Sequence, residues 1–205
     1  MITLYQLKPR FQDGLRPVAR WLHGSGVSAN QITVAALVLA IVTAGIITLQ
    51  PVPTTLLWLP PILFLRMALN ALDGMLAREF QQPTPLGAVL NELGDVLADA
   101  ALYLPLLLIP GVSAPPVIAL IWLALLSEFC GVVAVQIGAG RRYDGPLGKS
   151  DRALLLGGIA LLLGFGVPAG FWLTVTLWIA AGLVALTGLN RLRAALQEIT
   201  FSCPS

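Results

Sequence analysis

Charged side chains, histidine and cysteine are all scarce in this 205-residue chain. Only 11% of the residues are charged, and there are one histidine and two cysteines. The net charge of +2 gives no basis for nucleic-acid binding. In contrast, 57% of the residues are hydrophobic, which is the composition of a membrane protein rather than of a soluble domain.

Long apolar runs account for most of the chain. About 20 helical residues cross roughly 30 Å of hydrocarbon, and six ranges approach that length. They are residues 31–49, 55–77, 86–108, 117–138, 153–167 and 171–190. We find no internal repeat and no soluble domain, so the sequence predicts a single-domain, all-α integral membrane protein with six transmembrane helices over residues 1–205.

The basic residues orient these predicted spans. Eleven of the twelve Lys and Arg residues precede the first span, follow the second or sixth, or separate the fourth from the fifth. The other connections, residues 50–53, 110–116 and 164–170, carry no charge. Lys and Arg collect on the cytoplasmic side, so we expect a bacterial-type inner-membrane protein with both termini in the cytoplasm. Cys130 then lies within a span and Cys203 in a cytoplasmic tail, and we expect no disulfide.

Residues 1–26 are polar and basic, and they do not resemble a signal peptide or a span. Apolar residues recur there at helical spacing, which predicts a helix in the headgroup plane. They are Leu4, Leu7, Phe11, Leu15, Val18 and Leu22. We expect Pro9, Gly14 and Pro17 to divide this helix. The segment is either a topology anchor or a part of the site that holds substrate lipid.

Four acidic residues lie in the segment from Asn70 to Asp95, next to residues predicted to lie in lipid. A charged side chain is costly at membrane depth and usually has a function there. Positions 66, 70, 73 and 77 share one helical face, and positions 87, 91, 95 and 99 share a face of the next helix. With a rise of 1.5 Å per residue, Asp73 and Asn91 lie roughly 7 to 8 Å deep, Asn70 and Asp95 roughly 12 to 14 Å, and Arg66 and Asp99 roughly 18 to 20 Å. The two polar stripes can therefore meet.

Oxygen ligands at matched depths suit Mg²⁺ or Mn²⁺, and neither His nor Cys is present among them to suggest zinc. Small residues on the same faces, Gly74, Ala77 and Gly87, allow a ligand to approach the backbone. Arg78 at the rim suits a phosphate.

The deeper charges have a structural interpretation. We expect Arg66 and Asp99 to form an ion pair, because an intramembrane charge usually has an opposite partner. Glu128, in the fourth range, either joins Arg66 or approaches the metal, and we favour the structural role.

These positions form a long gapped motif. It reads Asn70-x-x-Asp73-Gly74-x-x-Ala77-Arg78, eight residues, then Gly87-x-x-x-Asn91-x-x-x-Asp95. The motif resembles the signature of the CDP-alcohol phosphotransferase family, which has Asp where this chain has Asn70 and Asn91. The segment Ser28–Thr33 and the six predicted spans also resemble the family, so the resemblance covers nearly the whole chain.

The resemblance implies an enzyme of phospholipid synthesis. An alcohol would attack the lipid-side phosphorus of a CDP-diacylglycerol-like lipid at the cytoplasmic face, with release of CMP and with Mg²⁺ or Mn²⁺ as cofactor. It also implies roles for motif residues. Asp95 would be both metal ligand and general base; Asp73, and Asn70 and Asn91 through their carbonyl oxygens, would be metal ligands; the CDP pocket would comprise Asn70, Asp73, Gly74, Ala77, Arg78, Thr84 and Gly87.

The two asparagines remove two negative charges from the family site. Glu92 and Asp99 are candidates to restore them, and without restoration a second metal ion is disfavoured. The alternative function is a catalytically impaired pseudoenzyme that binds a nucleotide lipid or a partner protein. An ion-coupled transporter would also use buried acids, but it predicts paired halves with broken helices at the midplane, and this chain shows neither.

The connection between the fourth and fifth ranges holds several cations beside glycines, which suggests a phosphate site. The positive-inside rule alone also explains cations here. With one cation from the end of the sixth range, the candidate ligands for an acceptor phosphate are Arg141, Arg142, Lys149, Arg152 and Arg191. By resemblance, they favour a phosphorylated alcohol such as glycerol phosphate or inositol phosphate over serine or choline. The resemblance also implies a homodimer in contact with membrane lipid.

Overall fold

The computed structural model describes residues 4–202, and within that range its only regular elements are helices joined by short connections, with no strand. Seven α-helices and two short 3₁₀ helices follow one another along the described chain. They are α1 (Leu4–Gly24), α2 (Ala29–Leu49), η1 (Pro53–Trp58), α3 (Leu59–Glu79), α4 (Pro85–Tyr103), η2 (Leu104–Leu108), α5 (Ala114–Gln136), α6 (Lys149–Gly164) and α7 (Phe171–Ser202). The predicted all-α class is confirmed.

Local capping signals explain where several helices begin. Ser28 caps α2, and its side chain and that of Gln31 form the reciprocal bonds of a capping box. Thr84 caps α4, which has Pro85 at its first position, where a missing N–H costs nothing. At the start of α6 the Gly148 N–H donates to the Asp151 carboxylate at 3.0 Å.

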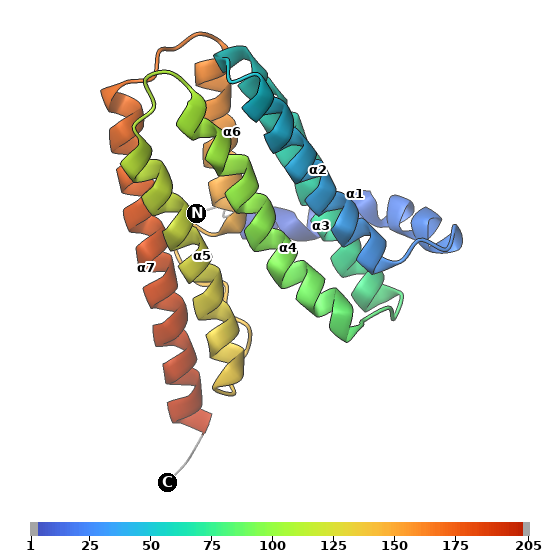
Figure 1. The fold of residues 1–205 in the computed structure, drawn as a ribbon. Helices are drawn as coiled ribbons and strands as arrows, with labels where there is room; N and C mark the ends of the chain where they lie inside the picture. The colour runs from blue at the N-terminus through green and yellow to red at the C-terminus, as the bar shows by residue number, and fades with distance from the viewer. Residues whose placement is uncertain (1–3, 203–205) are drawn as a thin grey trace.

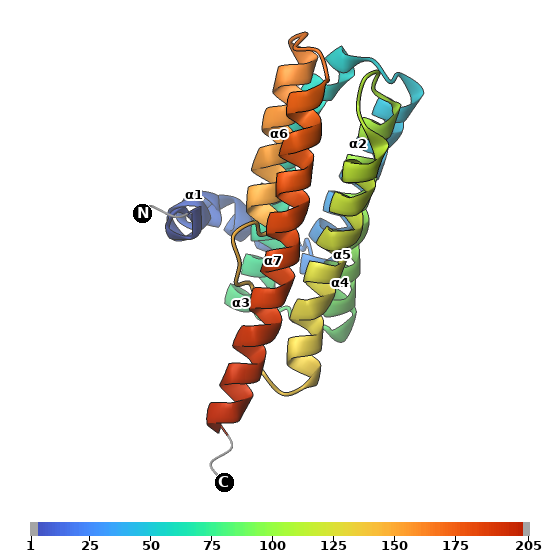
Figure 2. The same ribbon diagram turned by 90° about the vertical axis from the view of Figure 1, so that its left-hand side faces the viewer.

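Helices α2 to α7 form a bundle in which successive helices run in opposite directions (Figure 1). The connections that follow α2, α4 and α6 gather at one end, and those that follow α3 and α5 lie toward the other (Figures 1 and 2). The connections after α2, α4 and α6 contain the uncharged residues 50–53, 110–116 and 164–170. Packing is closest between α5 and α7 and between α2 and its neighbours α3 and α4.

The N-terminal helix crosses the direction of the bundle (Figures 1 and 2). Our expectation that Pro9, Gly14 and Pro17 divide it was wrong, because α1 is one helix from Leu4 to Gly24. Its apolar face packs on α3, where Ala19 is fully buried among Leu72 and its neighbours. Packing of an amphipathic face outweighs the unfavourable local propensity. The placement of α1 at the membrane interface stays a prediction.

Four segments of the described chain are long and apolar enough to cross a membrane. They are Ala29–Leu49, Pro53–Glu79, Ala114–Gln136 and Phe171–Thr200. The predicted third and fifth spans do not qualify by length and composition. Helix α4 carries Glu92, Asp95 and Asp99, and α6 has only 16 residues and begins at Lys149. The count of six spans therefore stays a prediction.

Helix bounds also differ from the predicted ranges. The third range, 86–108, holds α4 and then a separate 3₁₀ turn that contains Pro105. Helix α7 continues to Ser202, twelve residues beyond the predicted end at Asn190. This extension and the end of α5 project together from the bundle (Figures 1 and 2). Cys203 lies outside the described residues, so our expectation about the cysteines remains untested.

Candidate active site

The two predicted polar stripes meet between α3 and α4. The side-chain amide of Asn70 donates a 3.0 Å hydrogen bond to the carboxylate of Asp95. One turn deeper, the Arg66 guanidinium donates to Asp99 at 2.6 Å. The predicted Arg66–Asp99 ion pair is confirmed, and so is the predicted meeting of the two stripes at the depth of Asn70 and Asp95. Asn91 is half-buried, one turn before Asp95, and the predicted pairing of its layer with Asp73 stays a prediction.

Asp73 is buried, and its carboxylate accepts a 2.9 Å hydrogen bond from the hydroxyl of Thr33 on α2. This carboxylate also lies close enough to Asp95 and Lys149 to interact with their charges. Our sequence interpretation assigned Thr33 no role. The signal available was its position one turn inside α2, in the Ser28–Thr33 segment that resembles the family.

The small motif residues have neighbours that explain their size. A Cβ on Gly74 would lie 2.9 Å from the guanidinium of Arg78, which folds back over it. A Cβ on Gly87 would lie 2.5 Å from the side-chain oxygen of Asn30. Ala77 packs at the contact of α1 with α3. Gly74 and Gly87 therefore let polar side chains approach the backbone closely.

Thr84 joins the start of α4 to α2. Its hydroxyl oxygen accepts from the Gly87 N–H at 2.9 Å and from the Asn30 amide at 3.1 Å. Capping and interhelical bonding thus explain Thr84 without a ligand. Its predicted place in a CDP pocket remains a proposal, and Asn30 is a further polar group at this position that the sequence interpretation missed.

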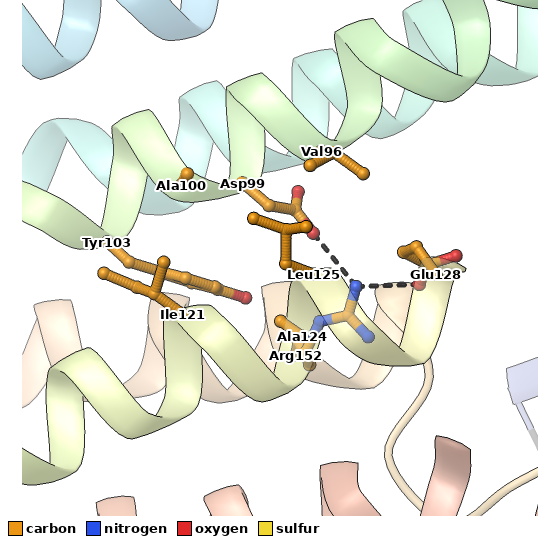
Figure 3. A pocket seen from close by; sticks show the side chains of 9 residues that line it. All are labelled: Val96, Asp99, Ala100, Tyr103, Ile121, Ala124, Leu125, Glu128 and Arg152. Atoms are coloured by element: carbon orange, nitrogen blue, oxygen red, sulfur yellow. Dashed lines mark hydrogen bonds and ion pairs between the residues drawn. The ribbon is translucent and has the colours of Figure 1, made fainter. Parts of the chain in front are cut away.

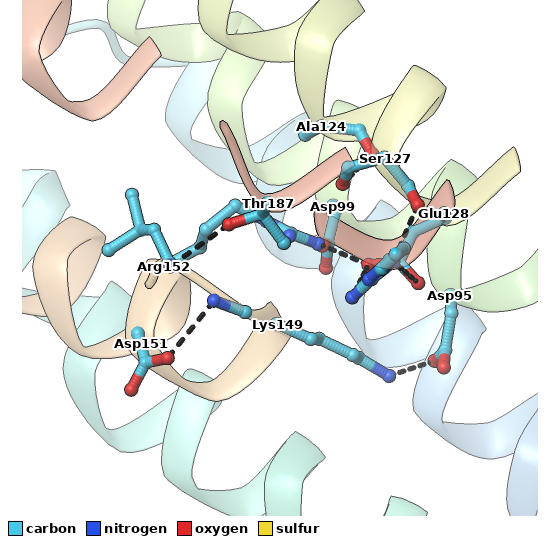
Figure 4. Close-up of polar contacts among 12 residues, drawn as sticks. Asp95, Asp99, Ala124, Ser127, Glu128, Lys149, Asp151, Arg152 and Thr187 are labelled. Atoms are coloured by element: carbon cyan, nitrogen blue, oxygen red, sulfur yellow. Dashed lines mark hydrogen bonds and ion pairs between the residues drawn. The ribbon is translucent and has the colours of Figure 1, made fainter. Parts of the chain in front are cut away.

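Lys149 is the first residue of α6, and its ammonium forms an ion pair with the carboxylate of Asp95 (Figure 4). Arg66 lies 3.6 Å from the same carboxylate and donates at 3.1 Å to the Asp95 carbonyl oxygen. We expected Lys149 to bind an acceptor phosphate. The structure places it beside the predicted general base, and its contact with an acceptor phosphate stays a prediction.

A buried group of ion pairs lies next to this site. Arg152 contacts both Asp99 and Glu128 at 3.0 Å, and Arg191 contacts Glu128 at 3.1 Å. Asp99, Glu128, Arg152 and Tyr103 line one narrow cavity (Figure 3). Glu128 pairs with cations, as we favoured, but the partner we named was wrong. In the described residues its ion pairs are with Arg141, Arg152 and Arg191 rather than Arg66.

Arg141 extends the group of ion pairs from the connection between α5 and α6. Its guanidinium forms a bidentate ion pair with Glu92, with hydrogen bonds of 2.9 and 2.7 Å, and lies 3.4 Å from the carboxylate of Glu128. Burial alone would lower the pKa of Arg141, but the hydrogen bond and charge of Glu92 offset this and raise the pKa above its ordinary value. The Arg141 guanidinium passes directly over Gly131, where a Cβ would lie 1.4 Å from it. Only glycine leaves room for this side chain at position 131.

The five cations proposed for an acceptor phosphate do not form one cluster. Arg142 pairs with Glu198 on the extension of α7 and donates to the Ala194 carbonyl oxygen at 3.0 Å. It therefore anchors the connection to α7. Arg152 and Arg191 are each 1% exposed, and some of their N–H groups have no hydrogen-bond partner among residues 4–202: Nε and Nη1 of Arg152, and Nε of Arg191.

The predicted metal ligands contain two carboxylates, Asp73 and Asp95, and two amide oxygens, from Asn70 and Asn91. All four are hard oxygen donors, which suit Mg²⁺ or Mn²⁺. Since Asn70 donates through its NH₂ group to Asp95, its carbonyl oxygen is the atom left for a cation. Within residues 4–202, no three His, Cys, Asp or Glu side chains cluster as a metal site. The donors fit one divalent cation with mixed carboxylate and amide ligands.

Three comparisons with known proteins agree. The family model described as CDP-alcohol phosphatidyltransferase matches residues 26–188. The inner membrane protein YnbA of Escherichia coli strain K12 is 49% identical over 198 residues, which span 95% of this chain and 97% of that protein. A phosphatidylinositol phosphate synthase of Corynebacterium glutamicum is 31% identical, over 89% of this chain and 84% of the synthase.

Solved structures share the fold. The crystal structure of Mycobacterium tuberculosis phosphatidylinositol phosphate synthase (PgsA1) with CDP-DAG bound has a TM-score of 0.71 and 24% identity, and covers 87% of this chain and 92% of that one. The structure of the same synthase with manganese and citrate has a TM-score of 0.71 and 24% identity, and covers 88% of both chains. The predicted family resemblance is confirmed.

Proposed function

The chain belongs to the CDP-alcohol phosphatidyltransferase family, and on that premise we propose that it transfers a phosphatidyl or other substituted phosphate group from a CDP-linked lipid to an alcohol, with release of CMP. The reaction would use Mg²⁺ or Mn²⁺ and serve phospholipid synthesis. A related synthase was solved with manganese and, separately, with CDP-DAG, which supports both choices.

The observation that carries this proposal is the 3.0 Å hydrogen bond between Asn70 and Asp95. It joins the two halves of the gapped motif across α3 and α4, at a depth where an acidic side chain is costly without a function. Asp73 lies one turn from Asn70 on α3 and is oriented by Thr33. The motif residues thus converge from two helices, with a third helix in support.

Each motif residue then has a chemical role. Asp73, Asp95, Asn70 and Asn91 would hold the metal ion, which supplies positive charge for the diphosphate of the donor. Asp95 is 24% exposed and would accept the proton of the attacking alcohol. Gly74, Arg78 and Gly87 would line the CDP pocket with Asn70, Asp73, Ala77 and Thr84. The Arg78 guanidinium, held above Gly74, suits a phosphate oxygen.

We propose a phosphorylated alcohol as the acceptor. Five cations pair with four acids in and beside the motif; the cations are Arg66, Arg141, Lys149, Arg152 and Arg191, and the acids are Glu92, Asp95, Asp99 and Glu128. The N–H groups of Arg152 and Arg191 without a partner are suited to phosphate oxygens. Two of the proteins similar to this chain are phosphatidylinositol phosphate synthases, from Corynebacterium glutamicum and Mycobacterium tuberculosis. Arg142, paired with Glu198, has a weaker claim.

The membrane arrangement extends this proposal. We propose that α4 and α6 also cross the membrane, because their acids and cations pair inside the bundle rather than face lipid. Both termini would then be cytoplasmic, with the site open to that side and α1 at the interface. YnbA, named as an inner membrane protein, supports a bacterial inner membrane. The homodimer implied by the family also remains a proposal, to be checked by light scattering in detergent.

The test is CMP release by the purified protein. It is incubated with CDP-diacylglycerol, Mn²⁺ or Mg²⁺, and matched acceptors with and without phosphate, such as inositol and inositol phosphate or glycerol and glycerol phosphate. We expect release that needs a metal, a phosphorylated acceptor and Asp95. Asp95→Asn is the inactive control, and exposed Asp144→Asn on the loop before α6 is the matched active control.

The second candidate is a pseudoenzyme of the same fold. The favouring observation is that the carboxylate of Asp95 already contacts Lys149 and Arg66 and accepts from Asn70. Such a site could bind a nucleotide lipid without turnover. Binding of CDP-diacylglycerol with no CMP release from any acceptor, and a cellular role that tolerates Asp95→Asn, would favour this function.

A further inference from the structure

We propose that the ammonium of Lys149 is the second cation of the active site, in the place of a second divalent metal ion. This inference rests on the proposed function and deepens it. A phosphoryl-transfer site often holds two cations, which stabilise charge on the attacking and leaving oxygens. Here one cation would be the metal ion held by Asp73 and Asp95, and the other is part of the chain.

The contacts of Lys149 set it apart from the other basic residues. Its ammonium pairs with the carboxylate of Asp95, the predicted general base (Figure 4). The side chain of Lys149 is 31% exposed. Arg66 also contacts Asp95, at 3.6 Å, but it is 5% exposed and pairs more closely with Asp99; Arg152 and Arg191 are 1% exposed and pair with other acids. Lys149 is therefore the cation at Asp95 that a substrate phosphate can still reach.

The backbone before Lys149 is held firmly. The Leu147 N–H donates at 3.1 Å to the Thr187 hydroxyl on α7, and the Gly148 N–H donates at 3.0 Å to Asp151. Gly145 has φ of 136° and lies so close to α7 that a Cβ there would be 2.6 Å from the Thr187 Cα. These contacts hold the first turn of α6 in place, so the backbone of Lys149 is fixed where its side chain reaches Asp95 on α4.

Charge arithmetic favours a single metal ion. The two carboxylates of the motif balance one divalent ion, and Asn70 and Asn91 contribute oxygen but no charge. A second divalent ion beside Lys149 would place five positive charges against these two carboxylates. With one ion and Lys149 there are three, and the substrate diphosphate then brings the compensating negative charge. Lys149 thus supplies the positive charge that a second metal ion would otherwise bring to the site.

Metal binding tests this directly, without reference to activity. Mn²⁺ is titrated into purified protein, and free Mn²⁺ is counted by electron paramagnetic resonance. We expect one tight Mn²⁺ per wild-type chain. In an Asn70→Asp/Asn91→Asp background, a second Mn²⁺ should bind at least about 10-fold more tightly after Lys149→Met, because the competing ammonium is gone. Two tight Mn²⁺ ions in the wild type, or no effect of Lys149→Met on the second ion, would overturn the proposal.

Turnover gives the second readout. Lys149→Met should lower kcat by about 100-fold, the typical effect of losing one charge-stabilising group. Lys149→Arg retains the positive charge, so its kcat should fall less than that of Lys149→Met. Exposed Arg193→Met is the matched control and should turn over like wild type. Wild-type kcat in Lys149→Met, with its fold verified by thermal unfolding, would overturn the proposal. If the wild type itself releases no CMP, the proposed function fails, and the Mn²⁺ titration still decides the place of Lys149.

Discussion

The hydroxyl of Thr33 donates a 2.9 Å hydrogen bond to the carboxylate of Asp73, which joins α2 to α3 at the predicted metal ligand. The Thr33 hydroxyl oxygen also lies 3.1 Å from the Ala29 carbonyl oxygen of its own helix, so its single proton is shared between two acceptors, and both Thr33 and Asp73 are buried. A ligand carboxylate oriented in this way has less freedom to turn from the metal. Thr33 is therefore a positioning residue for Asp73.

Thr33→Val should weaken Mn²⁺ binding, and activity at limiting Mn²⁺, by about 10- to 100-fold, the usual cost of losing a partner of a metal ligand. Saturating Mn²⁺ should restore part of the activity. The matched control is Thr43→Val on the same helix, where the hydroxyl donates to the Leu39 carbonyl oxygen of its own helix at 2.7 Å. Equal Mn²⁺ dependence in the two variants, measured by titrating Mn²⁺ in the CMP-release assay, would contradict the role assigned to Thr33.

Mn²⁺ should stabilise the folded protein through Asp73. At about 100 times its dissociation constant, a ligand that binds only the folded state adds about 2.7 kcal/mol to the free energy of unfolding. We expect a corresponding rise in Tm for wild type and for Asp144→Asn, and a much smaller rise for Asp73→Asn. Thermal unfolding in detergent with EDTA or Mn²⁺ measures it. A rise retained in full by Asp73→Asn would place the metal elsewhere.

Gly131→Ala should destabilise the protein by about 1–3 kcal/mol, the cost of overpacking a filled site. The added Cβ would coincide with the Arg141 guanidinium, so Arg141 must leave Glu92 and Glu128. Gly158→Ala is the matched control, since a Cβ there meets nothing within 4 Å. Unfolding in detergent should separate the two variants, and equal stability would show that Arg141 moves at no cost.

Arg66→Met should lower the free energy of unfolding by about 3 kcal/mol, because it leaves Asp99 buried with one cation fewer. Adding Asp99→Asn should recover part of this loss, so the double variant is more stable than the sum of the single effects predicts. Arg16→Met, which breaks an exposed pair with Glu79, serves as the control and should shift stability far less. Additive effects of Arg66→Met and Asp99→Asn would mean that the pair is not coupled.

The contacts between α3 and α4 follow from helical geometry. A step of three or four residues places Arg66 and Asn70 on one face and Asp95 and Asp99 on another. The short connection between the helices then makes the depths comparable, which is why the pairs Asn70–Asp95 and Arg66–Asp99 were predictable. The roles of these residues in metal and CDP binding depend on the family resemblance and stay proposals.

Contacts beyond the α3–α4 pair were not predictable in this way. Periodicity places a residue on a face of its own helix, but it does not say which other helix that face meets. Lys149 was therefore expected at a phosphate and is found at Asp95, and Glu128 was expected at Arg66 and is found with Arg152 and Arg191. Arg142 likewise found a partner on a part of α7 that the predicted span did not include.

By itself, the sequence determined the helical class, the family motif and the pairing of neighbouring stripes, because these depend on composition and on periodic spacing along one or two adjacent helices. The tertiary structure alone decided that Thr33 orients Asp73, that α1 continues through Pro9 and Pro17, and that Lys149 reaches Asp95. The physical reason is that each of these results from packing among segments far apart in the chain, where the energies of long-range contacts outweigh local preference.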